Sequence, residues 1–299
     1  MKVTAIRERL GMIDMTSFGK LELSELDVLE RVCGARIDRP VGSIAYTQLL
    51  DERGGIVGDV TVTRVAKDRF RVITGAGAVD SDRGFLELHG AHVMDVTDDW
   101  AVIGLWGPAV RGSLEDFPFR SAKEIDVGGV RVIGQRMTYV GEYGYELYVR
   151  PDDAEHVWDL LVETLQPEPV GYQALDSLRI EKGYRYFGTD LTSSDTPFDS
   201  GLGFAVAKDK WTQLDRDPPT MLRTLLVGGS EYLTVYGGEA VHREGEVVGR
   251  VRSAAYGFTV QRNVALAKLP SELGEGSEVE VDVMGELVPA VVAPTDLLK

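Results

Sequence analysis

The sequence of 299 residues contains one cysteine, Cys33, so no disulfide can form within the chain. A lone thiol fits a reducing compartment, and we therefore expect a cytoplasmic protein. Thiolate clusters are excluded for the same reason. Among the four histidines only His89 and His92 are close, and their spacing is not that of a metal-binding pair on a helix. The sequence therefore predicts no metal site.

Long apolar runs are also absent. Residues 1–15 contain neither a long apolar stretch nor a small-residue cleavage site, and no segment approaches the length of a membrane span. We therefore expect neither a secretion signal nor a membrane partner. The chain also lacks Gly-x-Gly-x-x-Gly and the P-loop lysine motif, so a dinucleotide or a nucleoside triphosphate is not indicated.

Basic residues are fewer than acidic residues. Lysine and arginine total 32 against 48 aspartates and glutamates, which gives a net charge of −16. Such a field repels nucleic acid and anionic membranes, so we expect neither as a partner. It also repels an anionic substrate, which would need a local arginine or lysine to bind.

The length predicts two or three subdomains. Along the chain, short helices are expected between longer runs of strand pattern. Strands are expected within 44–73, with a turn at 51–55, and in a hairpin around Gly128-Gly129. Helices are expected from Ser24, with Asp27 as a capping-box partner, to Gly34, and at 152–165 and 171–182. Residues 209–220 read as a linker. The alternation over 278–284 with a return at 288–292 predicts a small antiparallel barrel or sandwich after it.

The stretch Tyr139-Val-Gly-Glu-Tyr-Gly-Tyr-Glu146 carries two carboxylates four residues apart. We expect Glu142 at a turn and Glu146 on the following strand. A carboxylate on the inner face of a strand is costly unless it accepts hydrogen bonds. The guanidine-like edge of a pteridine ring would supply two donors. The alternative is a surface hairpin with solvated glutamates.

Three further features each allow a binding and a structural interpretation. Asp59 follows the glycine-rich turn Gly54–Gly58, where it could orient or deprotonate an amine nitrogen, stabilise an iminium cation, or simply accept hydrogen bonds from turn amides. Arg179 could bind a ligand carboxylate or pair with Asp176 on its own helix. The aromatic loop 183–190 could stack on a flat heterocycle or fill a seam between subdomains.

The order of these motifs is more specific than any one of them. Gly-Gly-x-x-x-Asp59 is followed by Leu-Trp-Gly-Pro108, by the Tyr139–Glu146 motif, by Asp-Ser-Leu-Arg179-x-Glu-x-Gly, and by Gly-Thr-Asp190 before Thr-Pro-Phe198. This series resembles the aminomethyltransferase family, which includes the T-protein of the glycine cleavage system. It is most similar to the tetrahydrofolate-binding C-terminal portion of dimethylglycine oxidase and sarcosine dehydrogenase, and to folate-dependent demethylases.

The resemblance implies an α+β fold, a three-subdomain cloverleaf of antiparallel sheets with helices and a small C-terminal β-barrel. We expect a folate-binding region at 1–210, made of two interleaved subdomains (1–45 with 139–210, and 46–138), and a barrel at 211–299. Tetrahydrofolate is the implied cofactor and Asp59 the implied catalytic acid. The residues expected to contact the folate are Glu146, Tyr139, Arg179, Tyr46 and Phe187.

The resemblance implies a tetrahydrofolate-dependent transferase that moves a methyl or methylene unit from a small methylated amine, sulfonium or methoxy donor. The alternative is a folate-binding subunit of a flavoprotein amine oxidase, which needs a flavoprotein partner. An iron–sulfur-assembly relative is disfavoured because Lys182-Gly-Tyr-Arg-Tyr-Phe-Gly lacks that branch's cysteine. A repurposed fold without folate is disfavoured by Asp59 and Glu146. Some residues depart from the family pattern, such as Asp199 in place of glutamate. These departures bear on the identity of the one-carbon donor more than on folate binding.

Overall fold

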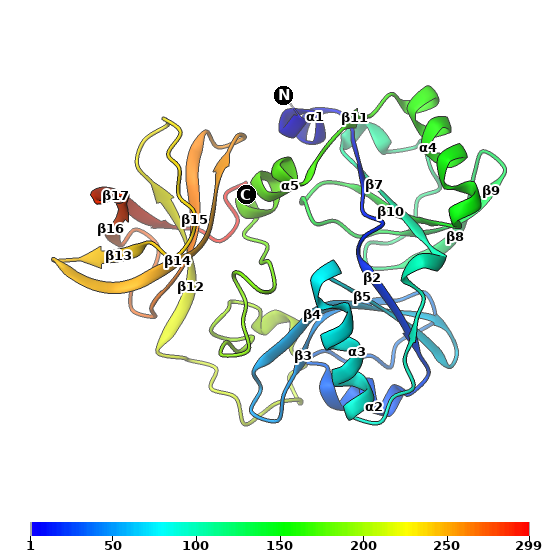
Figure 1. The fold of residues 1–299 in the computed structure, drawn as a ribbon, viewed down its shortest axis with the longest axis horizontal. Coiled ribbons are helices and arrows are strands. Elements are labelled where there is room, and N and C mark those ends of the chain that lie inside the picture. The colour runs from blue at the N-terminus through cyan, green and yellow to red at the C-terminus, as the bar shows by residue number, and fades with distance from the viewer. Residues whose placement is uncertain (1, 299) are drawn as a thin grey trace. The chain divides into compact units, whose positions relative to one another are not determined.

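The structure is a computed structural model that describes residues 2–298. Its contacts group the chain into two units. The first contains residues 1–138, 142–171 and 205–212, and the second contains 139–141, 172–204 and 213–299. Each unit has its own hydrophobic core, and the ribbon in Figure 1 labels their elements.

A six-stranded sheet in the first unit has the order β11-β1-β7-β10-β9-β8. Its strands are β1 (Gly11–Asp14), β7 (Ala101–Trp106), β8 (Ala122–Val127), β9 (Val130–Gln135), β10 (Gly144–Val149) and β11 (Glu168–Pro169). Side chains of β10 alternate between the two faces, as a strand requires. Tyr145, Leu147 and Val149 pack into a core that also takes in the buried face of α4 (Pro151–Leu165). Glu146 and Tyr148 therefore face the other side. A short helix, α1 (Lys2–Glu8), precedes β1.

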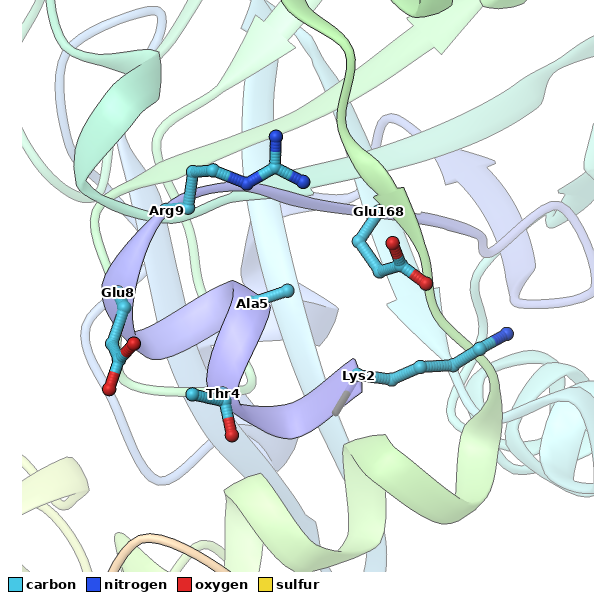
Figure 2. A pocket seen from close by; sticks show the side chains of 6 residues that line it. All are labelled: Lys2, Thr4, Ala5, Glu8, Arg9 and Glu168. Atoms are coloured by element: carbon cyan, nitrogen blue, oxygen red, sulfur yellow. The ribbon is translucent and has the colours of Figure 1, made fainter.

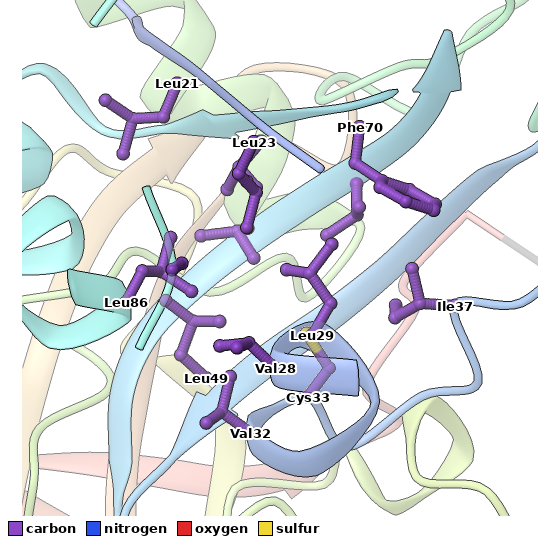
Figure 3. Close-up of a cluster of buried hydrophobic side chains, with 14 of the residues drawn as sticks. Leu21, Leu23, Val28, Leu29, Val32, Cys33, Ile37, Leu49, Phe70 and Leu86 are labelled. Carbon is purple, nitrogen blue, oxygen red and sulfur yellow. The ribbon is translucent and has the colours of Figure 1, made fainter. Parts of the chain in front are cut away.

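The second sheet of this unit has the order β3-β4-β5-β2-β6. Its strands are β2 (Gly19–Leu23), β3 (Ile44–Leu50), β4 (Ile56–Ala66), β5 (Arg69–Thr74) and β6 (Met94–Asp95). One face packs against α2 (Leu26–Val32) and α3 (Val79–Leu88) through the apolar cluster in Figure 3, which includes Leu29, Leu49, Phe70 and Leu86. Burial of this cluster, at roughly 25 cal/mol per Å² of apolar surface, stabilises the sheet–helix layer.

The opposite face of the five-stranded sheet carries many polar side chains, and several of them, such as Lys20, Gln48 and Arg71, are buried. The guanidinium carbon of Arg71 on β5 lies 5.9 Å from the ring centroid of Tyr148 on β10, so this face meets the Glu146 face of the six-stranded sheet. We call the polar side chains of the two faces the polar layer. Its members are Lys20, Glu22, Tyr46, Gln48, Asp59, Thr63, Arg71, Gln135, Glu146 and Tyr148.

The second unit contains a closed barrel with the order β12-β15-β14-β13-β16-β17. Its strands are β12 (Thr220–Val227), β13 (Ala240–Arg243), β14 (Glu246–Gly257), β15 (Arg262–Pro270), β16 (Glu278–Val283) and β17 (Glu286–Ala293). Helix α5 (Tyr172–Glu181) packs on the barrel because Ile180 joins a buried cluster with Val264 and Leu266.

The predicted fold class is confirmed: the chain is α+β, with antiparallel sheets, few helices and a closed C-terminal barrel. The helices expected at 152–165 and 171–182 are confirmed as α4 and α5, and the expected return strand at 288–292 lies within β17. The capping-box prediction is wrong. Glu25, not Ser24, is the N-cap residue of α2, and no side chain caps that helix. The predicted domain boundaries stay a prediction.

Candidate active site

Asp59 lies on β4 directly opposite Gln48 on β3. The Gln48 amide Nε2 donates a hydrogen bond to Asp59 Oδ1 at 2.8 Å, and the Tyr46 hydroxyl donates to Oδ2 at 3.1 Å. These three side chains share the polar face because strand alternation sends Ala45, Leu49 and Val60 into the apolar core. The carboxylate of Asp59 is thus held at both oxygens. The structure thus places Tyr46 and Gln48 in contact with Asp59, and the site roles expected for Asp59 and Tyr46 stay predictions.

A second carboxyl group, that of Asp82 on α3, lies beneath the same strand. The Thr74 hydroxyl donates to its Oδ2, and a Cβ at Gly58 would come within 2.8 Å of its Oδ1. Burial, with a contribution from the nearby charge of Asp59, raises the pKa of Asp82 to about 6. Only glycine at position 58 therefore lets this acid approach the strand that carries Asp59.

Glu146 lies on β10 between Gly104 of β7 and Gln135 of β9. Its Oε2 accepts a hydrogen bond of 3.3 Å from the Tyr148 hydroxyl. Glu146 keeps some solvent exposure, but the dense protein around its carboxyl raises its pKa to about 7. The prediction that Glu142 lies at a turn and Glu146 on the strand is confirmed. A carboxyl group with so few protein donors is suited to accept hydrogen bonds from a ligand.

Arg71 on β5 is a cation of the polar layer, 5.9 Å from the ring centroid of Tyr148. Its Nε and Nη2 donate to Glu22 Oε1 at 3.0 and 2.7 Å, and its guanidinium lies 4.4 Å from the ring centroid of Trp100. Lys20 lies on the same sheet face, where burial lowers its pKa to about 8 although Asp98 opposes the shift. Both cations have protein partners, since Lys20 Nζ donates to the carbonyl oxygens of Thr16 and Thr97.

Several buried polar atoms of the polar layer have no hydrogen-bond partner among residues 2–298. They are Gln48 Oε1, Thr63 Oγ1, Arg71 Nη1, Gln135 Oε1 and Gln135 Nε2. Buried polar groups in native proteins are nearly always paired, and each orphan costs about 1–3 kcal/mol. Such a concentration in one layer is typical of a surface that binds a polar ligand.

Three of the predicted site residues belong to the second unit. The Tyr139 hydroxyl donates to the Arg185 carbonyl at 2.7 Å, and its ring lies 6.1 Å from that of Tyr184. Phe187 is half-buried on the loop after α5 and bridges to Leu191. The contacts of Tyr139 hold its ring against the loop that the sequence singled out, whereas the bridge to Leu191 pairs the backbone of Phe187.

Arg179 is buried and held by protein groups. Its Nη1 donates to Asp190 Oδ2 at 2.6 Å, its Nε to Asp176 Oδ1 at 3.2 Å, and its Nη2 to the Ser253 hydroxyl at 3.3 Å. The helix ion pair with Asp176 is therefore confirmed, and Arg179 joins α5 to the following loop and to β14.

Other features of the described residues carry no comparable chemistry. The pocket in Figure 2 is lined by Lys2, Thr4, Ala5, Glu8, Arg9 and Glu168, none of them a predicted site residue. Among residues 2–298 no group of three or more His, Cys, Asp or Glu side chains could hold a metal ion. None of the helices between residues 2 and 298 is long and apolar enough to cross a membrane. Cys33 is buried, which raises its pKa to about 12 and makes it unreactive.

Sequence reasoning missed Gln48, Gln135, Arg71 and Asp82. Gln48 carried a signal, because it follows Tyr46 at the spacing of one strand face and would lie opposite Asp59 in a hairpin closed at 51–55. Gln135 and Asp82 carried no signal in the sequence, since only the folded structure brings them close to Glu146 and to the strand of Asp59.

The chain is similar to known proteins over nearly its whole length. The family model of the GCVT N-terminal domain matches residues 2–210, and that of the glycine cleavage T-protein C-terminal barrel domain matches residues 221–299. The aminomethyltransferase T of Bartonella henselae has the same fold, with a TM-score of 0.88 at 23% identity over 99% of this chain and 88% of that chain.

Curated relatives fall into two groups. The 4-methylaminobutanoate oxidase (formaldehyde-forming) of Paenarthrobacter nicotinovorans is 34% identical over 97% of this chain, and rat mitochondrial dimethylglycine dehydrogenase is 27% identical over 98%. The chain spans only 39% and 38% of the length of these two proteins. The aminomethyltransferase of Bacillus subtilis is 29% identical, over 99% of this chain and 89% of its own length.

Proposed function

Because the chain belongs to the glycine cleavage T-protein family, we propose that it is a tetrahydrofolate-dependent transferase. It moves a methyl or methylene unit from a small methylated donor to tetrahydrofolate. A cytoplasmic location is part of this proposal.

The observation that carries the proposal is the set of unpartnered buried polar atoms in the polar layer, on the same sheet faces as Asp59 and Glu146. A pteridine ring is flat and carries hydrogen-bond donors and acceptors around its edge, so it fits a layer that offers unused donors and acceptors of both kinds. The donor set therefore fits tetrahydrofolate.

Each site residue has a chemical role in this proposal. Glu146 accepts hydrogen bonds from the amino group and ring N–H of the pteridine edge, which compensates for its burial. Asp59, fixed by Gln48 and Tyr46, acts beside the reacting folate nitrogens. There it stabilises a cationic iminium species or accepts a proton as the nitrogen bonds to the one-carbon unit. Burial keeps the reactive carbon away from water.

The residues of the second unit have supporting roles. Tyr139 and Phe187 stay predicted folate contacts, because aromatic rings can stack on a flat heterocycle. The contacts of Arg179 favour an orienting role, because Asp190 and Ser253 already occupy its guanidinium.

A methylated amine is the favoured class of donor. The names of two relatives, dimethylglycine dehydrogenase and 4-methylaminobutanoate oxidase, both refer to N-methylated amines. The net charge of −16 also favours a donor that carries positive charge.

Titration calorimetry with tetrahydrofolate, followed by mass analysis of the folate products across methylated amines, sulfonium compounds and methoxy-aromatics, tests the proposal. We expect tetrahydrofolate binding and a methyl- or methylene-folate product with at least one N-methyl amine. Absence of tetrahydrofolate binding would contradict it.

A second candidate is a folate-binding subunit of a flavoprotein amine oxidase. It is supported by the names of two relatives, dimethylglycine dehydrogenase and 4-methylaminobutanoate oxidase, which both refer to oxidation of an amine. In that case a product appears only when an amine-oxidising flavoprotein co-purifies with the chain or is added to it.

A further inference from the structure

Gln135, the last residue of β9, lies directly opposite Glu146 in the antiparallel ladder between β9 and β10. Side chains in such a pair leave the sheet on the same face, with Cβ atoms about 4.5–5.5 Å apart. Gln135 is fully buried, and neither its Oε1 nor its Nε2 has a hydrogen-bond partner among residues 2–298. A carboxamide with both ends unused therefore stands beside the carboxyl group proposed to hold the pteridine.

The neighbouring donors on this side of the sheet are already engaged. The Trp106 Nε1 donates to the Met137 carbonyl at 2.9 Å, and the Tyr148 hydroxyl donates to Glu146. In the described polar layer an unpaired N–H donor remains on Gln135, at Nε2, and on Arg71, at Nη1, and of these two residues Gln135 lies directly opposite Glu146.

A purely structural role does not account for this residue. Glutamine has no preference for a buried strand position, where valine or isoleucine would pack without an unpaired polar group. An orphaned buried amide destabilises the ligand-free protein, and a ligand that completes its hydrogen bonds would offset that cost.

We propose that Gln135 selects 4-oxo over 4-amino pteridines by donating its Nε2–H to the oxygen at ring position 4. The inference rests on the proposed folate function and deepens it. On a 2-amino-4-oxo ring, the 2-amino group and N3–H are adjacent donors, and the 4-oxo group next to them is an acceptor. Glu146 matches the two donors, and the amide beside it matches the acceptor.

A 4-amino ring presents N–H groups where the oxo group was. Two donors then face each other as long as Nε2 of Gln135 points to the ring, the orientation on which the proposed selectivity depends. In addition, N3 no longer carries a proton for Glu146. A site whose polar groups pair only with the cognate ligand discriminates strongly against an analogue that leaves them unpaired.

The test compares tetrahydrofolate with its 4-amino-4-deoxy counterpart, both by anaerobic titration calorimetry. The variants are Gln135→Met, which keeps side-chain length, and Gln173→Met, an exposed glutamine on α5, as the matched control. We expect the wild type and Gln173→Met to prefer the 4-oxo ligand at least tenfold. In Gln135→Met this preference falls at least tenfold, through weaker binding of tetrahydrofolate.

Thermal unfolding without ligand provides a second readout. Because Gln135→Met removes an unpaired buried amide, we expect its ligand-free midpoint to equal or exceed that of the wild type while its ligand selectivity falls. A merely structural glutamine would do the reverse.

The outcomes separate the inference from the function on which it rests. If neither ligand binds the wild type, the proposed function fails. If both bind, and the ratio of their dissociation constants is the same within twofold in wild type and Gln135→Met, only the role of Gln135 is overturned.

Discussion

Asp59 is the residue on which turnover is expected to depend. Its two oxygens accept hydrogen bonds from Gln48 and Tyr46, so replacing it with asparagine keeps its size but removes the charge beside the reacting nitrogens. We predict that Asp59→Asn lowers kcat about 10²–10⁴-fold, the usual range for acid–base help, and changes tetrahydrofolate affinity less than threefold. Steady-state kinetics and calorimetry measure the two quantities.

Asp68→Asn serves as the control, because Asp68 is an exposed carboxylate in the turn after β4. It is expected to leave both quantities unchanged. Wild-type turnover in Asp59→Asn would remove Asp59 from the chemistry.

Glu146 makes stability depend on pH. Burial raises its pKa from the usual 4.5 to about 7, so the folded state favours the protonated acid. The resulting stabilisation is complete below pH 4.5 and is lost as the pH rises through about 7. A shift of this size corresponds to roughly 3 kcal/mol at most. We predict that Glu146→Gln and wild type have similar stability at pH 4.5, whereas Glu146→Gln is the more stable at pH 8.

Denaturant unfolding at the two pH values measures this difference. Asp82, with a pKa of about 6, changes stability with pH in the same direction as Glu146. Asp82 and Lys20 are present in both wild type and Glu146→Gln, so their effects cancel in the comparison. A constant difference in unfolding free energy between pH 4.5 and 8 would show that Glu146 is not buried as described.

At the residue scale the sequence pointed to the two acids and to Tyr46, but not to the glutamines beside the acids. Asp59 and Glu146 stood out because carboxylates on strand patterns next to glycine turns are unusual. Gln48 and Gln135 did not, because a glutamine in a strand becomes informative only when the register reveals what lies opposite and its amide proves to be buried.

At the scale of elements, the buried pair of Arg179 and Asp190 joins α5 to its loop and to β14. Removing one partner of a buried pair leaves an uncompensated charge, at a typical cost of about 3–5 kcal/mol. We predict that Arg179→Met lowers the unfolding free energy by about this amount, measured by denaturant titration. Tetrahydrofolate affinity of the folded variant is expected to change less than threefold.

Arg179→Met combined with Asp190→Leu is the control, because it removes both charges and should recover part of the loss. Unchanged stability together with a tenfold loss of tetrahydrofolate affinity would instead identify Arg179 as a ligand for the folate carboxylates.

Elements with strong periodicity were predicted well. The apolar spacing in α4 and the strict alternation in β16 each specify one period, and both elements end within a few residues of the expected positions. The two-residue strands β6 and β11 have no pattern of their own, because backbone pairing with β2 and β1 alone defines them. The capping box failed because Glu25 accepts a hydrogen bond from the Ser24 amide, and the helix begins after it.

For the whole molecule, the net charge of −16 repels the two carboxylates of the folate glutamate tail. Salt screens this repulsion, since the Debye length falls from about 30 Å at 0.01 M to about 8 Å at 0.15 M. We predict that the association rate constant of tetrahydrofolate, measured by stopped-flow fluorescence, rises severalfold from 0.01 to 0.15 M ionic strength.

Tetrahydropterin, which lacks the glutamate tail, is the control and should show little dependence on salt. An association rate for tetrahydrofolate that falls with salt would mean that a local basic patch, and not the net charge, governs encounter.

The central claim is that the polar layer of the first unit binds the pteridine of a reduced folate. A crystal structure with 5-formyltetrahydrofolate tests it most directly. The account predicts the amino edge of the ring on Glu146 and its N5–N10 region beside Asp59. A ring bound away from the polar layer, or Glu146 and Asp59 both turned to solvent with no folate contact, would contradict it.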